Sequence, residues 1–138
     1  MNTSPRIKIA LDAVGGDHGP APCIEGAFQA VRESDVDVIL VGDETLLQEE
    51  CARLGCRDPR LSVRHASQIV SMHEPPASMV RKKRDSSIWI ATEMVKKNEA
   101  DAVVSPGNTG ASMVASFFLL GLTKGVERPA IATSLPTV

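Results

Sequence analysis

Apolar and polar positions along the chain follow two alternating periods, which predicts strands separated by helices. Short apolar runs bounded by turn residues are typical of buried parallel strands, and apolar residues spaced three and four apart are typical of helices. The runs that predict strands are 7–12, 37–41, 61–65, 101–105 and 130–134. Helices are predicted from Pro20 to beyond Val31, and over 44–54, 77–84, 88–98 and 108–122. This alternation predicts a largely parallel sheet with helices on both faces, a three-layer α/β/α fold.

Capping residues mark the ends of two of these helices. Asp43 is a good N-cap for the second helix, and Gly55 directly follows its last residue. Asp85, Ser86 and Ser87 supply cap residues for the fourth helix. The chain stops directly after the last apolar run, so we expect a single α/β domain or the N-terminal part of a larger one.

Two glycine-rich turns stand where a predicted strand gives way to a helix. The first turn is Asp12-Ala13-Val14-Gly15-Gly16-Asp17-His18-Gly19-Pro20, and the second is Ser105-Pro106-Gly107-Asn108-Thr109-Gly110-Ala111. Glycine allows a positive φ and a close approach of ligand to the backbone. The free N–H groups and the dipole at a helix start favour an anion. Two such turns in one chain predict a protein that binds phosphate.

In the first turn, Asp12 ends its strand at the edge where open α/β sheets place their ligands. Gly15 and Gly16 can present successive N–H groups to an anion, and Asp17 could position a donor or a lysine. Simple capping of the turn explains the two aspartates equally well. The turn lacks the Gly-Lys-Ser/Thr end of a P-loop and the G-x-G-x-x-G spacing of a dinucleotide site, so neither is supported.

In the second turn, Asn108 and Thr109 can each cap the helix and also hydrogen-bond a phosphate oxygen. Simple N-capping is the alternative, and the bracket of Gly107 and Gly110 favours binding. The helix behind the turn is apolar nearly all round, which predicts a buried and rigid helix end that would strengthen an anion site. Its apolar run is too short to cross a bilayer.

A basic run, Arg81-Lys82-Lys83-Arg84, follows a stretch without clear periodicity over 67–76. Two adjacent prolines end that stretch, which predicts a loop and a candidate lid. The basic run could be a solvated face, could neutralise phosphate, or could dock an acidic protein partner.

Composition limits the remaining possibilities. The chain has 138 residues, of which 43% are hydrophobic and 23% charged, with a net charge of −2, so we expect a globular domain and no general nucleic-acid binding. One Trp, three Phe and no Tyr offer few surfaces on which bases could stack. Cys23, Cys51 and Cys56 lack the spacing of metal ligands, so we expect buried, reduced thiols, no zinc site and a cytoplasmic protein. No targeting segment is predicted.

The first turn closely resembles the opening of the bacterial phosphate acyltransferases of phospholipid synthesis, the PlsX family. Further stretches resemble the same family in the same order: Glu74-Pro75-Pro76, Arg81-Lys82-Lys83-Arg84-Asp85-Ser86-Ser87, Gly107-Asn108-Thr109-Gly110-Ala111 and Glu127-Arg128-Pro129-Ala130. Together they cover essentially the whole chain. Three positions depart from the family: Val14 replaces a frequent Met, Pro106 replaces a small residue and lacks an N–H, and His18 is not always His. Family members are much longer, so the resemblance covers only their N-terminal part.

The resemblance implies that acyl-[acyl carrier protein] and inorganic phosphate react to acyl phosphate and free carrier protein. Phosphate is then the nucleophile, so no Ser or Cys triad, metal or redox cofactor is needed. Asn108, Thr109 and Gly110 would bind phosphate, Gly15, Gly16 and Asp17 would form the opposing wall, and Asp12 would hold the first turn in place. Arg81 and its neighbours would offset negative charge or receive the acidic carrier. A homodimer with peripheral contact to the inner face of the cell membrane is also implied.

Other functions stay open at this point. A phosphate acetyl- or butyryltransferase that uses acyl-CoA has the same phosphate chemistry, and a non-catalytic phosphate-binding or regulatory module would need the same two turns. A dehydrogenase relative is less favoured because neither turn supplies a dinucleotide site. A purely structural role would have no use for two glycine turns that suit an anion.

Overall fold

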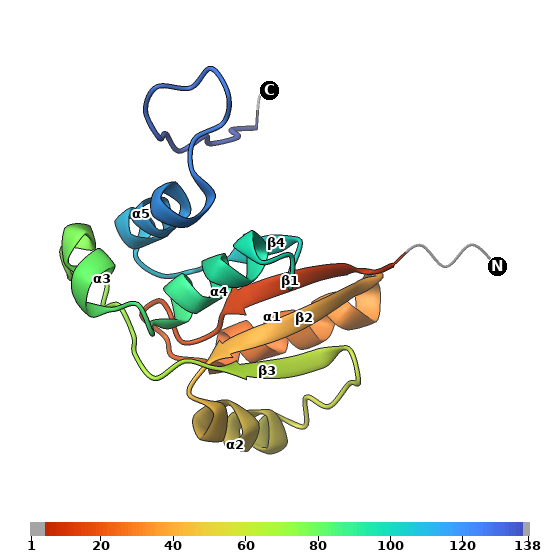
Figure 1. Cartoon of the computed structure of the whole chain (residues 1–138). Helices are drawn as coiled ribbons and strands as arrows, with labels where there is room; N and C mark the ends of the chain where they lie inside the picture. The colour runs from red at the N-terminus through yellow and green to blue at the C-terminus, as the bar shows by residue number, and fades with distance from the viewer. Residues whose placement is uncertain (1–4, 137–138) are drawn as a thin grey trace.

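The computed structural model describes residues 5–136, in which strands and helices alternate as the sequence pattern predicts (Figure 1). The strands are β1 (Ile7–Asp12), β2 (Val36–Gly42), β3 (Leu61–His65) and β4 (Ala102–Val104). The helices are α1 (Ala21–Glu33), α2 (Glu44–Leu54), α3 (Pro76–Lys82), α4 (Ser87–Lys96) and α5 (Thr109–Leu120).

The four strands form one parallel sheet in the order β3-β2-β1-β4. The chain first moves outward from β1 to β2 and β3, and then returns to the other side of β1 to form β4. The strand order therefore reverses between β1 and β4. In open α/β sheets the carboxyl ends of the strands at such a reversal frame a crevice where ligands bind.

Helices cover both faces of the sheet, which confirms the predicted three-layer α/β/α class (Figure 1). On one face α1 and α2 pack against the sheet through a core that includes Ile24, Leu40 and Leu47. On the other face α4 packs through Ala91 and Met94. Alternate residues of β1 and β2 contribute to the two cores because successive side chains point to opposite faces.

A third apolar cluster joins α3, α4 and α5 beyond the edge of the sheet. Met79 of α3, Trp89 of α4, and Ala111 and Ala115 of α5 are buried together there. The small alanines let α5 approach its neighbours closely, so the start of α5 is held beside the start of α3. This cluster positions the second glycine turn.

Local signals explain where most helices begin and end. Asp43 accepts a hydrogen bond from the N–H of Leu46 at 2.8 Å, and Gly55 ends α2 in the left-handed conformation with φ of 68°, as predicted. Ser86 stands at the N-cap of α4, but the predicted capping contact is wrong. Its hydroxyl donates to the carbonyl of Lys83 at 2.7 Å instead, and Asp85 accepts hydrogen bonds from Ser67.

Two expectations for the end of the chain are wrong. The predicted strand 130–134 is not formed, and Figure 1 shows the blue segment after α5 leaving the body of the protein. Helix α5 is not buried all round, since Phe117 and Leu120 are exposed and Phe118 has 56% of its surface exposed. The physical reason is that α5 packs on α3 and α4 through one face, whereas Val126 and Ile131 of the following segment only line an open hollow beside Phe117 on the other face.

The expectation of three buried cysteines is correct only for Cys56. Cys23 and Cys51 are half-buried, and all three thiols are free. Burial raises the pKa of each of these thiols, so they are weak nucleophiles at neutral pH.

The contrast between core and tail gives a stability test. Ile24→Ala removes a fully buried side chain of α1 and should lower the free energy of unfolding by about 2–5 kcal/mol. Ile131→Ala is the matched control, because this side chain is 60% exposed and should change stability very little. Urea unfolding measures both. A large effect of Ile131→Ala would mean that the segment after α5 is packed on the body.

Candidate functional site

The two glycine turns lie against each other where the strand order reverses between β1 and β4. A Cβ atom added to Gly107 would stand 3.3 Å from the Cα atom of Gly15. Gly16 has φ of +88°, and a Cβ atom there would stand 3.3 Å from the carbonyl oxygen of Pro106. The fold thus brings together two turns that are about ninety residues apart in the sequence.

The side chain of Asp12 lies between the two turns and bonds to the second one through Ser105. Ser105 Oγ donates to Asp12 Oδ2 at 2.7 Å and accepts from the N–H of Gly107 at 3.1 Å. Ser105 is absent from the residues that the sequence predicted for the site. The signal that could have found it is the strand register, because Leu11 pairs with Val104 and Asp12 and Ser105 follow directly.

The carboxylate of Asp12 leaves no room for a side chain in the first turn. Asp12 is only 3% exposed, and a Cβ atom on Gly15 would stand 2.5 Å from Oδ2. Oδ1 is buried and has no hydrogen-bond partner, alone among the buried side-chain nitrogen and oxygen atoms of the described residues. Such an unpaired buried acceptor is costly, which marks the site for a donor.

At the second turn the start of α5 offers backbone donors. Asn108 Oδ1 accepts from the N–H of Ala111 at 3.0 Å, and the N–H of Ser112 bonds to the carbonyl of Asn108. The N–H groups of Thr109 and Gly110 come earlier in the first turn, where helical geometry provides no partner. They are therefore the donors that this helix start can offer to an anion.

The amide nitrogen of Asn108 is committed to the loop before α3. Nδ2 donates toward the carbonyl oxygens of Ser71, Met72 and Glu74 at 3.1, 3.3 and 3.0 Å. Both ends of the side chain are thus occupied, one by the cap of α5 and one by the loop. The contact predicted between this side chain and phosphate stays a prediction, and in this structure the side chain joins the start of α5 to the loop before α3.

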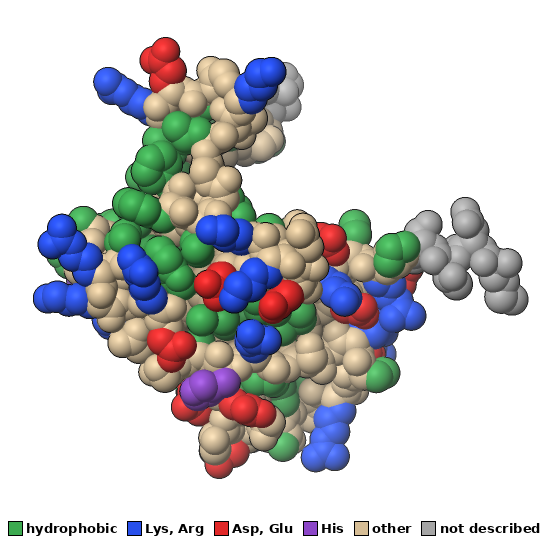
Figure 2. Space-filling view, viewed as in Figure 1, with side chains coloured by type: hydrophobic (Ala, Val, Ile, Leu, Met, Phe, Trp, Pro, Cys, Tyr) green, Lys and Arg blue, Asp and Glu red, His purple; other side chains and the backbone are tan. Residues whose placement is uncertain are grey.

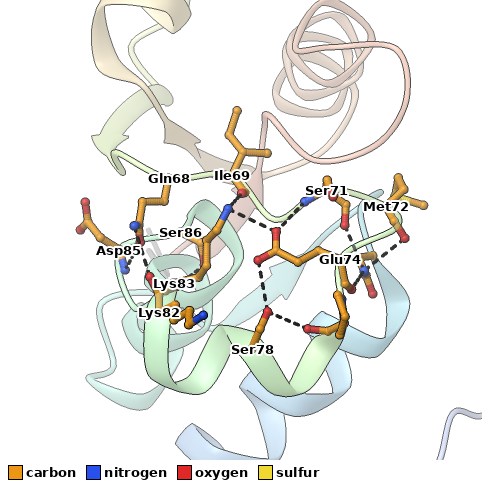
Figure 3. Close-up of polar contacts among 12 residues, drawn as sticks. Gln68, Ile69, Ser71, Met72, Glu74, Ser78, Lys82, Lys83, Asp85 and Ser86 are labelled. Atoms are coloured by element: carbon orange, nitrogen blue, oxygen red, sulfur yellow. Dashed lines mark hydrogen bonds and ion pairs between the residues drawn. The ribbon is translucent and has the colours of Figure 1, made fainter.

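The same loop is held from its other side by Lys83, as Figure 3 shows. Lys83 Nζ donates to the carbonyl of Ile69 at 2.7 Å and pairs with Glu74 Oε2 at 3.2 Å. Ser78 Oγ donates to Glu74 Oε1 at 3.2 Å. The Lys83 ammonium, with help from the Ser71 N–H and Ser78, holds the pKa of Glu74 below its ordinary value. In this structure the predicted lid is therefore a loop whose residues 69–74 are held by Lys83 and Asn108, and we call it the pinned loop.

Two residues of the predicted basic run, Lys83 and Arg84, donate hydrogen bonds to backbone carbonyls. Arg84 donates to the carbonyl of Val80 at 2.7 Å and lies over the ring of Trp89, so it serves packing as Lys83 does. Arg81 and Lys82 are exposed. Figure 2 shows Lys and Arg side chains gathered at the end of the molecule that α3 occupies.

Other predicted residues of the first turn face solvent. Asp17 and His18 are exposed, and no ion pair involving either is present among the described residues. Across residues 5–136 no group of three or more His, Cys, Asp or Glu side chains is arranged to hold a metal ion. Within the same residues no helix has the length and hydropathy to cross a membrane.

The fold and these turns define a class: a three-layer α/β protein with a candidate anion site at the reversal of its strand order. Sequence comparison specifies the family. The profile of the family described as "Fatty acid synthesis protein" matches residues 7–138, and the chain belongs to that family.

Its relatives include proteins named "Phosphate acyltransferase". One from Geotalea daltonii is 50% identical over 132 residues, which are 96% of this chain and 38% of the relative. One from Desulforamulus reducens is 51% identical over 95% of this chain and 39% of the relative. This chain therefore spans well under half the length of these relatives.

A solved structure shares the fold. The EutD phosphotransacetylase from Staphylococcus aureus superposes on this chain with a TM-score of 0.61 and 19% sequence identity. The match covers 89% of this chain and 40% of the EutD chain. At that identity the likeness concerns the fold alone.

The contact between Gly15 and Asp12 can be tested with two glycine variants. Gly15→Ala should lower the free energy of unfolding by about 1–3 kcal/mol, because the new methyl group would overlap the carboxylate. Gly26→Ala in α1 meets nothing within 4 Å and should raise stability by about 0.5–1 kcal/mol, as Ala does in a helix. Thermal or urea unfolding compares them. Effects of the same sign would contradict the described packing.

The pinned loop gives a second test. Lys83→Met should speed amide hydrogen exchange over 69–74, because the carbonyl of Ile69 and the carboxylate of Glu74 both lose their ammonium partner. Arg81→Met removes an exposed basic side chain from the last turn of α3, just before Lys83, and should leave exchange in the loop unchanged.

The same contact predicts a pH effect. The pKa of Glu74 is depressed on folding, so the contact contributes above the ordinary value of 4.5 and is lost as the pH falls further. Exchange in the loop, corrected for its intrinsic pH dependence, should rise in that acid range in the wild type and rise less in Lys83→Met, where Glu74 keeps only its contacts to Ser71 and Ser78. An equal response in both proteins would exclude this pair as the cause.

Proposed function

We propose that this chain forms the phosphate-holding part of a phosphate acyltransferase, which moves an acyl group from acyl-[acyl carrier protein] to inorganic phosphate. The products are acyl phosphate, for phospholipid synthesis, and the free thiol of the carrier. One observation carries this function: two glycine turns meet around Asp12 where the strand order reverses. The name shared by the relatives supports it.

Phosphate would sit beside the Asp12 carboxylate, where the two turns meet. The N–H groups of Thr109 and Gly110, with the dipole of α5, face it from one side, and the backbone of Gly15 and Gly16 faces it from the other. Asp17 would complete the outer wall of the first turn. Because a phosphate oxygen is itself the nucleophile, the protein has to aim it at the thioester carbon and stabilise the oxyanion that forms. No metal or redox cofactor is needed for that step.

The side chain of Asn108 would hold the parts of this site in place. It closes the first turn of α5 and holds the loop at 71–74, so the donors of Thr109 and Gly110 keep one orientation. Gly107 supplies the close contact to the first turn. Residues outside this chain would complete the site, since the relatives are much longer.

The carrier protein would approach over α3. A Cβ atom on Gly110 would stand 2.5 Å from Cγ of Pro76, so the start of α3 touches the second turn. Arg81 and Lys82 are exposed on the same helix and would attract an acidic carrier, mainly by accelerating encounter. A cytoplasmic homodimer with peripheral contact to the inner face of the membrane agrees with this role.

An assay of thiol release tests the reaction in the protein at its full natural length. Acyl-[acyl carrier protein] should release its thiol only when phosphate is present, and acyl phosphate should accumulate. Acyl-CoA is the parallel donor. Preference for acyl-CoA would indicate a phosphate acetyl- or butyryltransferase, and phosphate binding without thioester cleavage would indicate a non-catalytic module.

Asn108→Ala tests the second turn within this reaction. Loss of the cap and of the loop contacts should raise the KM for phosphate and lower kcat, together by about 10²-fold in kcat/KM. Gln29→Ala is the control, because this amide lies on the surface of α1 and donates to Glu33 of the same helix. Unchanged phosphate kinetics in Asn108→Ala would remove the second turn from the site.

A further inference from the structure

The carboxylate of Asp12 is an unexpected neighbour for an anion. It lies between the two turns, and the ion pairs found among the described residues do not include it. A fixed negative charge at this position would repel a fully deprotonated oxyanion. Removal of the charge from water makes the repulsion stronger, because the interior screens it poorly.

The two oxygens of Asp12 have different environments. Oδ2 accepts from Ser105 Oγ at 2.7 Å, and Ser105 in turn accepts from the N–H of Gly107. Oδ1 is buried with no partner among the described residues. An ionised carboxylate oxygen can only accept, so Oδ1 requires a donor. The fixed position of Oδ2 also fixes the direction of Oδ1.

Inorganic phosphate can bring that donor with it. At neutral pH it retains at least one P–O–H group, whereas sulfate retains no proton. A P–O–H group facing a carboxylate makes a short, charge-assisted hydrogen bond. The charge that repels sulfate thus becomes a favourable contact for hydrogenphosphate.

We propose that Asp12 Oδ1 accepts a hydrogen bond from the P–O–H group of bound hydrogenphosphate, and that this contact makes the site select phosphate over sulfate. Ser105 is a positioning residue in this arrangement, because it holds the other carboxylate oxygen. A Cβ atom on Gly15 would stand 3.2 Å from Oδ1, so the first turn covers this oxygen, and the proposed contact requires the turn to shift when the ion binds. This role for Asp12 rests on the proposed function.

Calorimetric titration of the full-length protein with potassium phosphate and potassium sulfate, at neutral pH and constant ionic strength, tests the selectivity directly. The wild type should bind phosphate at least about tenfold more tightly than sulfate. Equal binding of the two ions would overturn the role of Asp12, even if thiol release depends on phosphate. Failure of both phosphate binding and phosphate-dependent thiol release would instead overturn the proposed function.

Asp12→Asn separates selectivity from structure. It removes the charge but keeps the shape, so sulfate should bind at least about tenfold more tightly than it does to the wild type. A merely structural aspartate would give weaker binding of both ions on substitution, and that result would contradict the proposal. Asp37→Asn is the matched control, since this carboxylate lies near the start of β2, at the end of the strands opposite to Asp12, and its substitution should not change sulfate binding.

Ser105→Ala keeps the charge and removes the hydroxyl that orients it. Phosphate binding should weaken, and sulfate should still be rejected. Ser105→Thr retains the hydroxyl and should restore phosphate binding. If Ser105→Ala gained sulfate binding as Asp12→Asn does, the charge of Asp12 would not be the discriminating feature. The comparison of the two ions in the wild type decides the question even if a variant fails to fold.

Discussion

The hydrogen bond from Ser105 to Asp12 joins the two halves of the site, and the arrangement of both glycine turns depends on it. It links the end of β1 to the end of β4 across the point where the strand order reverses. The same hydroxyl accepts from the N–H of Gly107, so one side chain connects the first turn, the second turn and the sheet. Because Asp12 fills the space between the turns, only glycine fits at position 15.

The second level of organisation is the frame around the start of α5. The buried cluster of α3, α4 and α5 sets where this helix begins, and Asn108 then ties its first turn to the loop at 71–74. Lys83, the residue directly after α3, holds the same loop. Asn108 belongs to a predicted phosphate site and Lys83 to a predicted basic run, and in the structure both side chains hold the same loop. Backbone N–H groups remain as the donors to an anion.

The site combines features that suit hydrogenphosphate in particular. Helix-start donors and glycine backbone attract any small oxyanion. The buried carboxylate opposes that attraction unless the anion carries a proton. Discrimination between ions of the same size and shape then follows from one acceptor atom, because an unmatched charge in a buried site is expensive. The sheet and helices that carry these residues have the same fold as the EutD phosphotransacetylase from Staphylococcus aureus.

The sequence by itself determined the fold class, the order of the elements through α5 and the two glycine turns. Each of these depends on local periodicity, on caps such as Asp43 and Gly55, and on glycine spacing, which are all readable along the chain. The sequence could not determine the partners of Asn108, Lys83 and Ser105, because their contacts come from segments up to 93 residues away. It also led to a wrong strand at 130–134 and a wrong burial of α5, since an apolar pattern shows what could be buried and not what covers it. Only the tertiary structure decided which polar groups pair with each other, and therefore which atom of Asp12 is left to meet a ligand.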